Sequence, residues 1–254
     1  LHCLSDGLCQ METKYFVHLL KCTYMKNILI TNVLFNKQRR DILIEGNLIS
    51  KVEPAGTIPA EGYDKVIDGS SKAIIPGFVN SHAHSAMTLF RGVGEDVPLD
   101  QWLKERIWPY EAKLDEEMVY WGAKLACIEM IKTGTTTFND MYWHIKGTLR
   151  AAEEMGMRSV QSYCWMDSMD ESLFEENKAR LQKAHRMSLD WSPLTTFAIS
   201  PHAIYTVTGK AFRYINSYAR DNDLIVHTHL AETRSEMDQS ERDYGMSPTE
   251  YLNK

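Results

Sequence analysis

The sequence has few cysteines, and none of them stands in a spacing that would form a structural site. Its five cysteines are scattered through 254 residues without a Cys-x-x-Cys pair. This pattern excludes a disulfide framework and a cysteine-based structural zinc site. Free, scattered cysteines are typical of a reducing compartment, so we predict a cytoplasmic protein.

An excess of positive charge and long apolar runs are also lacking. Lys and Arg total 28 against 34 Asp and Glu, a net charge of −6, which argues against a nucleic-acid-binding protein. No apolar run approaches a membrane span, and the apolar patch at residues 15–20 is too short for a signal-peptide core. We therefore expect a small-molecule substrate as the partner, with no nucleic acid and no membrane. The composition is also compatible with a homo-oligomer.

The first 70 residues contain two kinds of segment. Residues 1–24 carry no recognisable motif, and Met25 stands directly before the first convincing strand, so we expect residues 1–24 to be a non-homologous or disordered lead. An N-terminal helix is the alternative. Short β segments separated by turn residues then predict a small antiparallel sheet over residues 25–70. Such a sheet is too small to be a complete domain.

Residues 71–254 alternate between strand and helix patterns. We expect strands at residues 73–79, 135–138, 158–165, 195–200 and 224–228. Repeated β-α units indicate a parallel sheet with right-handed crossovers. Roughly five such strands, against the eight of a closed (β/α) barrel, predict a truncated TIM barrel in the α/β class. An open doubly wound sheet is the alternative, but no glycine-rich phosphate loop follows the first strand.

The longest expected helix, Asp115 to Lys132, has a clear apolar stripe. Acidic residues occupy its first turn and Gly134 follows its end, as is usual for helix termini. The stripe consists of Met118, Trp121, Leu125 and Ile128. We expect these side chains to pack in the core.

Polar side chains stand where the predicted strands end. The first strand leads into His82-Ala83-His84, the second into Asn139-Asp140, the fourth into His202, and the fifth into His227-Thr228-His229. Side chains two apart on a strand share a face, so His82 and His84 project into one space. Converging imidazoles are typical zinc ligands. In a β/α barrel the carboxyl ends of the strands form the active site.

His229 is the expected third metal ligand. His227 shares its face but lies deeper in the strand, where we expect a packed, hydrogen-bonded histidine instead. Three histidines leave a coordination position for water, whose pKa the ion would lower. Such a site needs a carboxylate that is not a ligand, and Glu232, three residues past His229, is placed to move the proton.

These motifs carry a resemblance to a known family. The run Pro76-Gly77-Phe78-Val79-Asn80-Ser81-His82-Ala83-His84, with Gly134-Thr135-Thr136-Thr137 and His229-Leu230-Ala231-Glu232, resembles the amidohydrolase superfamily from about Met25 onward. Within it the sequence is most similar to the S-adenosylhomocysteine/5′-methylthioadenosine deaminases and their chlorohydrolase relatives. The resemblance implies a barrel with a small β-sandwich and one divalent ion, Zn²⁺ first, with Fe²⁺ or Mn²⁺ compatible. It makes His82, His84 and His229 the ligands and Glu232 the proton shuttle.

The resemblance also implies three substrate-binding residues. The segment from Ser85 to Leu114 is long for a β-α connection, which suggests a loop over the active site. Trp102 and Glu111 within it match the residues that contact adenosine, with Glu111 on the ribose hydroxyls. By composition alone Trp108 is an equal candidate. His202 matches a substrate-contacting histidine.

The sequence departs from the family in two ways. Members that bind the amino-acid tail of S-adenosylhomocysteine place arginines after strand three, where this sequence has none between Ser162 and Asp167. A carboxylate needs such a cation, so methylthioadenosine, 5′-deoxyadenosine or adenosine is favoured. The family's aspartate ligand and a strand-six histidine would lie beyond Lys254.

We therefore hypothesise a metal-dependent hydrolase that deaminates an adenine nucleoside to the inosine analogue and ammonia. Another amidohydrolase reaction is the first alternative: guanine deamination, or hydrolysis of a chlorinated ring or a cyclic amide. A non-catalytic fragment is the second. Trp102 together with Glu111 favours a substrate that carries a ribose.

Overall fold

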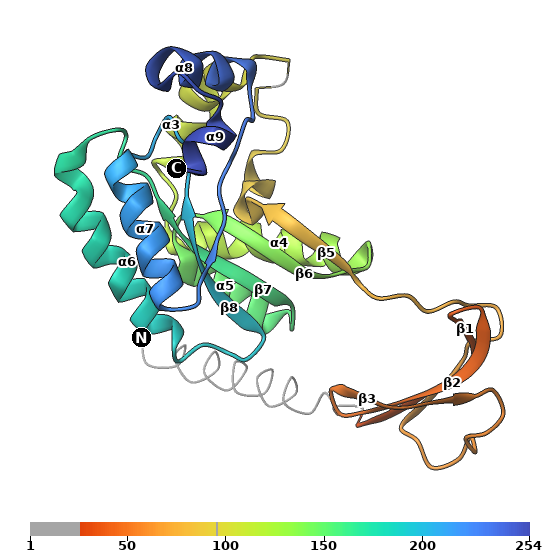
Figure 1. Ribbon diagram of the computed structural model, residues 1–254. Helices are drawn as coiled ribbons and strands as arrows, with labels where there is room; N and C mark the ends of the chain where they lie inside the picture. Colours follow the sequence, from red (N-terminus) through yellow and green to blue (C-terminus); the bar gives the residue numbers. More distant parts are fainter. Residues whose placement is uncertain (1–25, 95) are drawn as a thin grey trace, which may run out of the picture. The chain divides into compact units, whose positions relative to one another are not determined.

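The computed structural model describes residues 26–94 and 96–254, so the prediction for residues 1–24 lies outside the described part (Figure 1). The chain divides into two compact units, Leu1–Pro76 and Gly77–Lys254. Among the helices of the described residues, none has the length and apolar composition needed to cross a bilayer.

The first unit contains one four-stranded sheet. Its strands are β1 (Asn27–Phe35), β2 (Gln38–Glu45), β3 (Leu48–Pro54) and β4 (Lys65–Asp68), in the order β3-β2-β1-β4. β1, β2 and β3 pair antiparallel as predicted, whereas β4 runs parallel to β1. Asp41, 1% exposed, accepts backbone hydrogen bonds from residues 56–58 and so holds the connection after β3. The described residues show one layer, so the second layer of a β-sandwich stays a prediction.

The second unit is built on a parallel sheet of five strands in sequential order. They are β5 (Phe78–Ala83), β6 (Thr135–Tyr142), β7 (Arg158–Trp165), β8 (Thr195–Pro201) and β9 (Ile225–Val226). All neighbouring pairs are parallel. A doubly wound sheet reverses its strand order at a switch point, and this sheet does not. The sheet therefore has the topology of five consecutive strands of a (β/α) barrel.

Helices connect these strands and extend beyond the last one. The connections after β5 are η1 (Ser85–Phe90), α2 (Leu99–Gln101), the π-helical η2 (Trp102–Ile107), α3 (Trp108–Glu111) and α4 (Glu116–Lys132). The others are α5 (Ile145–Glu154), η3 (Glu171–Leu173), α6 (Phe174–Ser188), α7 (Gly209–Asp221), α8 (Arg234–Tyr244) and α9 (Pro248–Leu252). The predicted start of the long helix is confirmed, because Asp115 is its N-cap and accepts from Met118 N.

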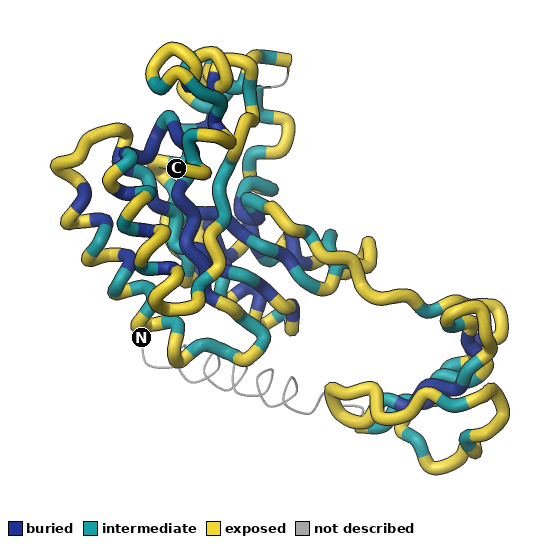
Figure 2. The backbone as a smooth tube through the Cα atoms, viewed as in Figure 1, coloured by how far each residue is buried: buried dark blue, intermediate teal, exposed yellow. Residues whose placement is uncertain are grey.

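The largest buried cluster lies between the sheet and two helices. Trp165 of β7 and Ile199 of β8 are fully buried against Leu181 of α6 and Ile215 of α7. Figure 2 shows β8 buried along most of its length, beneath the helices that Figure 1 labels α6 and α7. This cluster fixes the carboxyl end of β8, where His202 follows.

The first predicted strand is wrong in its bounds and in its burial. Residues 73–79 were expected to form a buried strand, but β5 begins at Phe78. Phe78 and Val79 are 56% and 66% exposed. β5 hydrogen-bonds to β6 alone among the described strands, so its other edge has no neighbour there. Ala73 instead bridges to Leu34 in the first unit. The last strand, predicted at residues 224–228, comprises two residues.

The prediction that the α4 stripe packs in the core is also wrong. Its four side chains are 42–57% exposed: Met118, Trp121, Leu125 and Ile128. The inward side chains of α4 are instead mostly small, apart from the buried Tyr120, because neighbouring segments approach its backbone closely at Gly122 and Glu116. A Cβ atom on Gly122 would lie 2.5 Å from Ala86 O, and one on Gly147 of α5 would lie 2.5 Å from Glu116 O. Large side chains do not fit between backbones at that separation.

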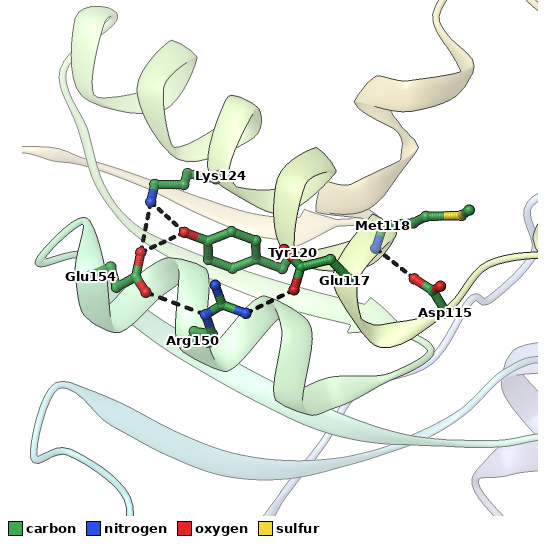
Figure 3. Close-up of polar contacts among 7 residues, drawn as sticks. All are labelled: Asp115, Glu117, Met118, Tyr120, Lys124, Arg150 and Glu154. Carbon is green, nitrogen blue, oxygen red and sulfur yellow. Dashed lines mark hydrogen bonds and ion pairs between the residues drawn. The ribbon is translucent and has the colours of Figure 1, made fainter. Parts of the chain in front are cut away.

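A polar network joins α4 to α5 (Figure 3). Glu154 Oε2 lies 2.6 Å from both Lys124 Nζ and the Tyr120 hydroxyl. Arg150 bonds to Glu154 at 3.3 Å and to Glu117 at 2.9 Å, and its guanidinium lies 3.7 Å from the Tyr120 ring centroid. The hydrogen bonds from Lys124 and Tyr120 lower the pKa of Glu154 to about 2.

We expect Glu154→Gln to lower the free energy of unfolding at pH 7 by on the order of 1 kcal/mol, because the network is largely exposed. The lowered pKa means that this stabilisation is present above the usual value of 4.5 and is lost as the pH falls toward about 2. Urea unfolding at pH 7, 5 and 3 should therefore show the two proteins converging. The control is Glu241→Gln, which removes the same charge from an exposed side chain on α8. If the difference in free energy of unfolding between the wild-type and Glu154→Gln proteins did not narrow at low pH, the stabilising role of the Glu154 carboxylate would be contradicted.

Candidate active site

Three histidine side chains converge where strands of the second unit end. His82 lies in β5, His84 is the N-cap of η1, and His229 follows β9. Their Nε2 atoms form a triangle in which every side measures 3.2 Å. Nitrogen ligands at 2.0–2.1 Å from a tetrahedral zinc ion are about 3.3 Å apart. The three nitrogen atoms are therefore spaced to hold one such ion.

The far nitrogen of two rings is fixed by a neighbour. His84 Nδ1–H donates to Met141 O at 2.6 Å, which leaves the lone pair of its Nε2 for a metal. His82 Nδ1 lies 2.6 Å from His227 Nε2, so His227 is hydrogen-bonded to a candidate ligand. Burial lowers the pKa of His229 to about 3 and also lowers that of His82. These two rings are thus neutral near pH 7, the form that binds metal ions.

The predicted site residues meet in one inner cavity of about 130 Å³. Six of the seven line it: His84, Trp102, Glu111, His202, His229 and Glu232. The seventh, His82, contacts two of them through the nitrogen triangle. Trp102 comes from η2 and Glu111 from α3, so the long segment after β5 reaches the histidines.

Glu232 stands beside the histidines on a segment held by α8. Glu236, 2% exposed, accepts from Glu232 N at 2.7 Å and from Ala231 N at 3.2 Å. Ala231 has a φ of +54°, which these bonds stabilise. Burial and the negative charge of Glu236 raise the pKa of Glu232. A carboxyl group with a raised pKa can both accept and return a proton near neutrality.

The other cavity residues are held in defined positions. Trp102 Nε1–H donates to Val93 O at 2.9 Å, which fixes the indole ring. His202 Nδ1 lies 2.8 Å from Thr206 Oγ1, and burial lowers the pKa of His202 to about 4. Trp108 lines the same cavity, so both tryptophans can contact a ligand.

A second, outer cavity of about 730 Å³ shares walls with the inner one. Leu103, Trp108, Glu111, Met166 and Tyr205 line both. The charged residues among the described ones that line the outer cavity are Asp100, Lys104, Glu111 and Glu236. Carboxylates therefore outnumber cations there.

Sequence reasoning assigned no role to two residues of β6 that the structure places at the site. Asp140, 1% exposed, accepts from Ser85 N at 2.6 Å and so fixes the chain directly after His84. The Tyr142 hydroxyl is buried at the inner cavity, and burial and the nearby Glu111 raise its pKa. Period-two spacing puts both on one face of the strand, which was the available signal. No sequence pattern could have indicated the Met141 carbonyl, because every residue carries a backbone carbonyl group.

Comparison with protein families matches residues 73–254 to the model described as the amidohydrolase family. A 5′-deoxyadenosine deaminase of Methanocaldococcus jannaschii is 45% identical over 233 residues, which cover 89% of this chain and 54% of that protein. A 5-methylthioadenosine/S-adenosylhomocysteine deaminase of Archaeoglobus fulgidus is 44% identical over 205 residues, 80% of this chain and 48% of that protein.

A crystal structure of an adenosine deaminase from Xanthomonas campestris with bound zinc resembles the chain with a TM-score of 0.79 and 31% identity. The match covers 89% of this chain and 54% of that one. The chain thus spans about half the length of the curated relatives it matches. Below, "full-length protein" means the complete product of the gene that encodes residues 1–254.

The nitrogen triangle predicts that the full-length protein binds one divalent ion per chain. His229→Asn should weaken Zn²⁺ binding at least about 100-fold in calorimetry, since it removes a direct ligand, whereas outer-shell changes cost 10–100-fold. The wild-type protein loaded with Co²⁺ should show the absorption bands of a nitrogen-ligated site. The His229→Asn variant should lack these bands. The control is His185→Asn, which removes a bond to Tyr218 and a stacking contact with Phe197 but no residue of the site. Equal affinity in the His229 variant would contradict this reading.

Proposed function

This chain belongs to the amidohydrolase family, and from that premise we propose that the full-length protein is a metal-dependent deaminase of an adenine nucleoside. The observation that carries the proposal is the triangle of Nε2 atoms beside Glu232, in a cavity that Trp102 and Glu111 also line. Curated relatives at 40–45% identity bear the names of 5′-deoxyadenosine and methylthioadenosine/S-adenosylhomocysteine deaminases, which supports this substrate class.

In the proposed site His82, His84 and His229 hold one divalent ion, which we take to be Zn²⁺. Such an ion supplies hydroxide near neutral pH. The proposed net reaction adds water to the adenine ring and releases ammonia, leaving the inosine analogue.

Glu232 is the proposed acid and base. It takes a proton from the attacking water and delivers it to ring nitrogen N1 as the C6–O bond forms. Glu232 then carries the remaining hydroxyl proton from the C6 oxygen to the amino group, the C6–N bond breaks, and ammonia leaves as the C6=O bond forms. The raised pKa of Glu232 suits a group that must carry a proton between two atoms of one reaction. Its backbone bond to Glu236 holds it in place.

Trp102, Glu111 and His202 are the proposed substrate-binding residues. Trp102 is fixed by its bond to Val93 and presents its ring to the cavity, where an aromatic base can stack. Glu111 lies where the inner and outer cavities meet. A carboxylate there can accept hydrogen bonds from both ribose hydroxyls.

The outer cavity is the proposed location of the 5′ substituent. Lys104 is the one cation among the described residues that line it, and three carboxylates share the cavity with it. Binding of a terminal carboxylate favours a guanidinium fork. The lining therefore supports 5′-deoxyadenosine, methylthioadenosine or adenosine over S-adenosylhomocysteine.

We expect the sheet of residues 25–70 to be one layer of a β-sandwich and residues 71–254 to belong to a barrel domain. Scattered free cysteines support a cytoplasmic location.

We expect Glu232→Gln to reduce kcat for 5′-deoxyadenosine by about 10²–10⁴-fold, the usual contribution of a general acid-base group. The amide keeps the size of the side chain but cannot carry the proton. Ammonia release measures the rate, and an unchanged Zn²⁺ content shows that the ligands are intact. The neighbouring exposed change Glu241→Gln on α8 should keep normal turnover. Full turnover in the Glu232 variant would exclude the proposed role.

Glu111→Gln should raise KM for adenosine by at least 10-fold while leaving the turnover of a free base unaffected, because only the nucleoside has ribose hydroxyls. Glu105→Gln in η2, an exposed carboxylate of the same segment, is the matched control. Equal losses for nucleoside and free base would favour the guanine-type alternative over a ribose-binding role.

A further inference from the structure

His227 has no role in the proposed function, although its ring contacts a member of the nitrogen triangle. Its Nε2 atom lies 2.6 Å from His82 Nδ1, and the two ring centroids are 4.7 Å apart in an edge-to-face arrangement. Among the described residues, no other atom lies at hydrogen-bond distance from His82 Nδ1. The orientation of the His82 ring therefore depends on His227.

The contact between the two rings joins the edge strands of the five-stranded sheet. His82 lies in β5 and His227 directly follows β9, which are the first and the last strand in the order β5-β6-β7-β8-β9. In a flat sheet, four strand spacings of about 4.8 Å would hold these strands about 19 Å apart. The sheet is thus curled enough for His227 to reach His82 from the opposite edge.

The backbone holds His227 more firmly than it holds His82. Pairing between β5 and β6 is interrupted between Asn80 and Ala83, and His82 stands in that interruption without a partner in the register. His227 N, in contrast, donates to Ile199 O of β8 at 3.0 Å. Ile199 belongs to the buried cluster between the sheet and its helices. A ring that is anchored to an inner strand therefore supports a ring whose own strand pairing is broken.

The chemistry of the two rings fixes where their hydrogen atoms must be. A neutral imidazole carries a hydrogen on one nitrogen and a lone pair on the other. For His82 Nε2 to offer its lone pair to a metal ion, the hydrogen of His82 must be on Nδ1, which then donates to His227 Nε2. The reverse arrangement, in which His227 Nε2–H donates, would put the His82 hydrogen on Nε2 and block the metal.

This arrangement leaves a buried donor on the far side of His227. With its Nε2 accepting, His227 carries its hydrogen on Nδ1, and that atom is buried without a partner among the described residues. A buried polar atom without a partner is rare and calls for a functional reason. The acceptor that the same ring presents to His82 supplies one.

We propose that His227 is a positioning residue of the metal site, which as a hydrogen-bond acceptor holds the His82 ring in the orientation and the tautomer that bind a metal ion. His227 is not itself one of the histidines whose nitrogen atoms converge. Partners of this kind, one bond removed from the ion, set the orientation and the basicity of a ligand. The inference rests on the proposed metal site and is independent of the substrate.

The test is the Zn²⁺ affinity of the full-length protein, measured by competition with a chromophoric chelator. His227→Leu keeps an apolar side chain but removes the acceptor, so it should weaken Zn²⁺ binding about 10–100-fold, as outer-shell changes do. His227→Gln can place its amide oxygen near the position of Nε2, and it should restore the affinity to within about 5-fold of wild type. The same two substitutions at His185, which lies outside the site, should leave the affinity unchanged.

Urea unfolding with and without Zn²⁺ separates positioning from packing. The stability that Zn²⁺ adds should be smaller in His227→Leu than in wild type, because a bound ligand stabilises according to its affinity. A packing role alone would lower the stability of the metal-free protein and leave the Zn²⁺ increment unchanged. Wild-type affinity in His227→Leu, or equal losses in the Leu and Gln variants, would overturn this proposal alone. A wild-type protein that binds no Zn²⁺ would overturn the metal site and this inference together.

Discussion

Three imidazoles with their Nε2 atoms 3.2 Å apart are the constraint on which the rest of the site depends. Nitrogen lone pairs at that distance repel unless a proton or a cation lies between them, so the arrangement needs outside support. The fold supplies it from several strands: Met141 O holds His84, His227 holds His82, and the His202 carbonyl accepts from His229 N. The buried cluster around Trp165 and Ile199 places the ends of β7 and β8.

The segment between β5 and α4 links this centre to the outer part of the molecule. It starts at Ser85, whose N–H is bonded to the buried Asp140, and it ends at Asp115, the N-cap of α4. Trp102 and Glu111 lie between those two fixed points and so are carried over the histidines.

Local signals were sufficient for much of the fold and the site. The strand at residues 158–165 and the helix with Asp115 as its N-cap were readable, because periodicity and caps depend on neighbouring residues. The His82-x-His84 pair and Glu232 followed from spacing at strand ends. What failed depended on distant contacts. Phe78 and Val79 read as buried, but their strand is an edge.

Which face of α4 turns inward also depends on contacts with residues distant in the sequence. Its apolar stripe was expected to pack in the core, yet the close approach of Ala86 and Gly147 leaves no room for large side chains at those points, and Tyr120 is the large side chain of α4 that is buried. The supporting groups of the histidines were equally invisible. Met141 contributes a backbone carbonyl, and Glu236 acts by accepting backbone N–H groups, which no side-chain pattern encodes.

The most direct test of the central claim is ammonia release by the Zn²⁺-loaded full-length protein from a panel of purines. The panel comprises 5′-deoxyadenosine, methylthioadenosine, adenosine, S-adenosylhomocysteine and guanine. The account predicts a clear preference in kcat/KM for the first three, whose 5′ groups carry no charge. Turnover of guanine alone, or of none of the five, would contradict it.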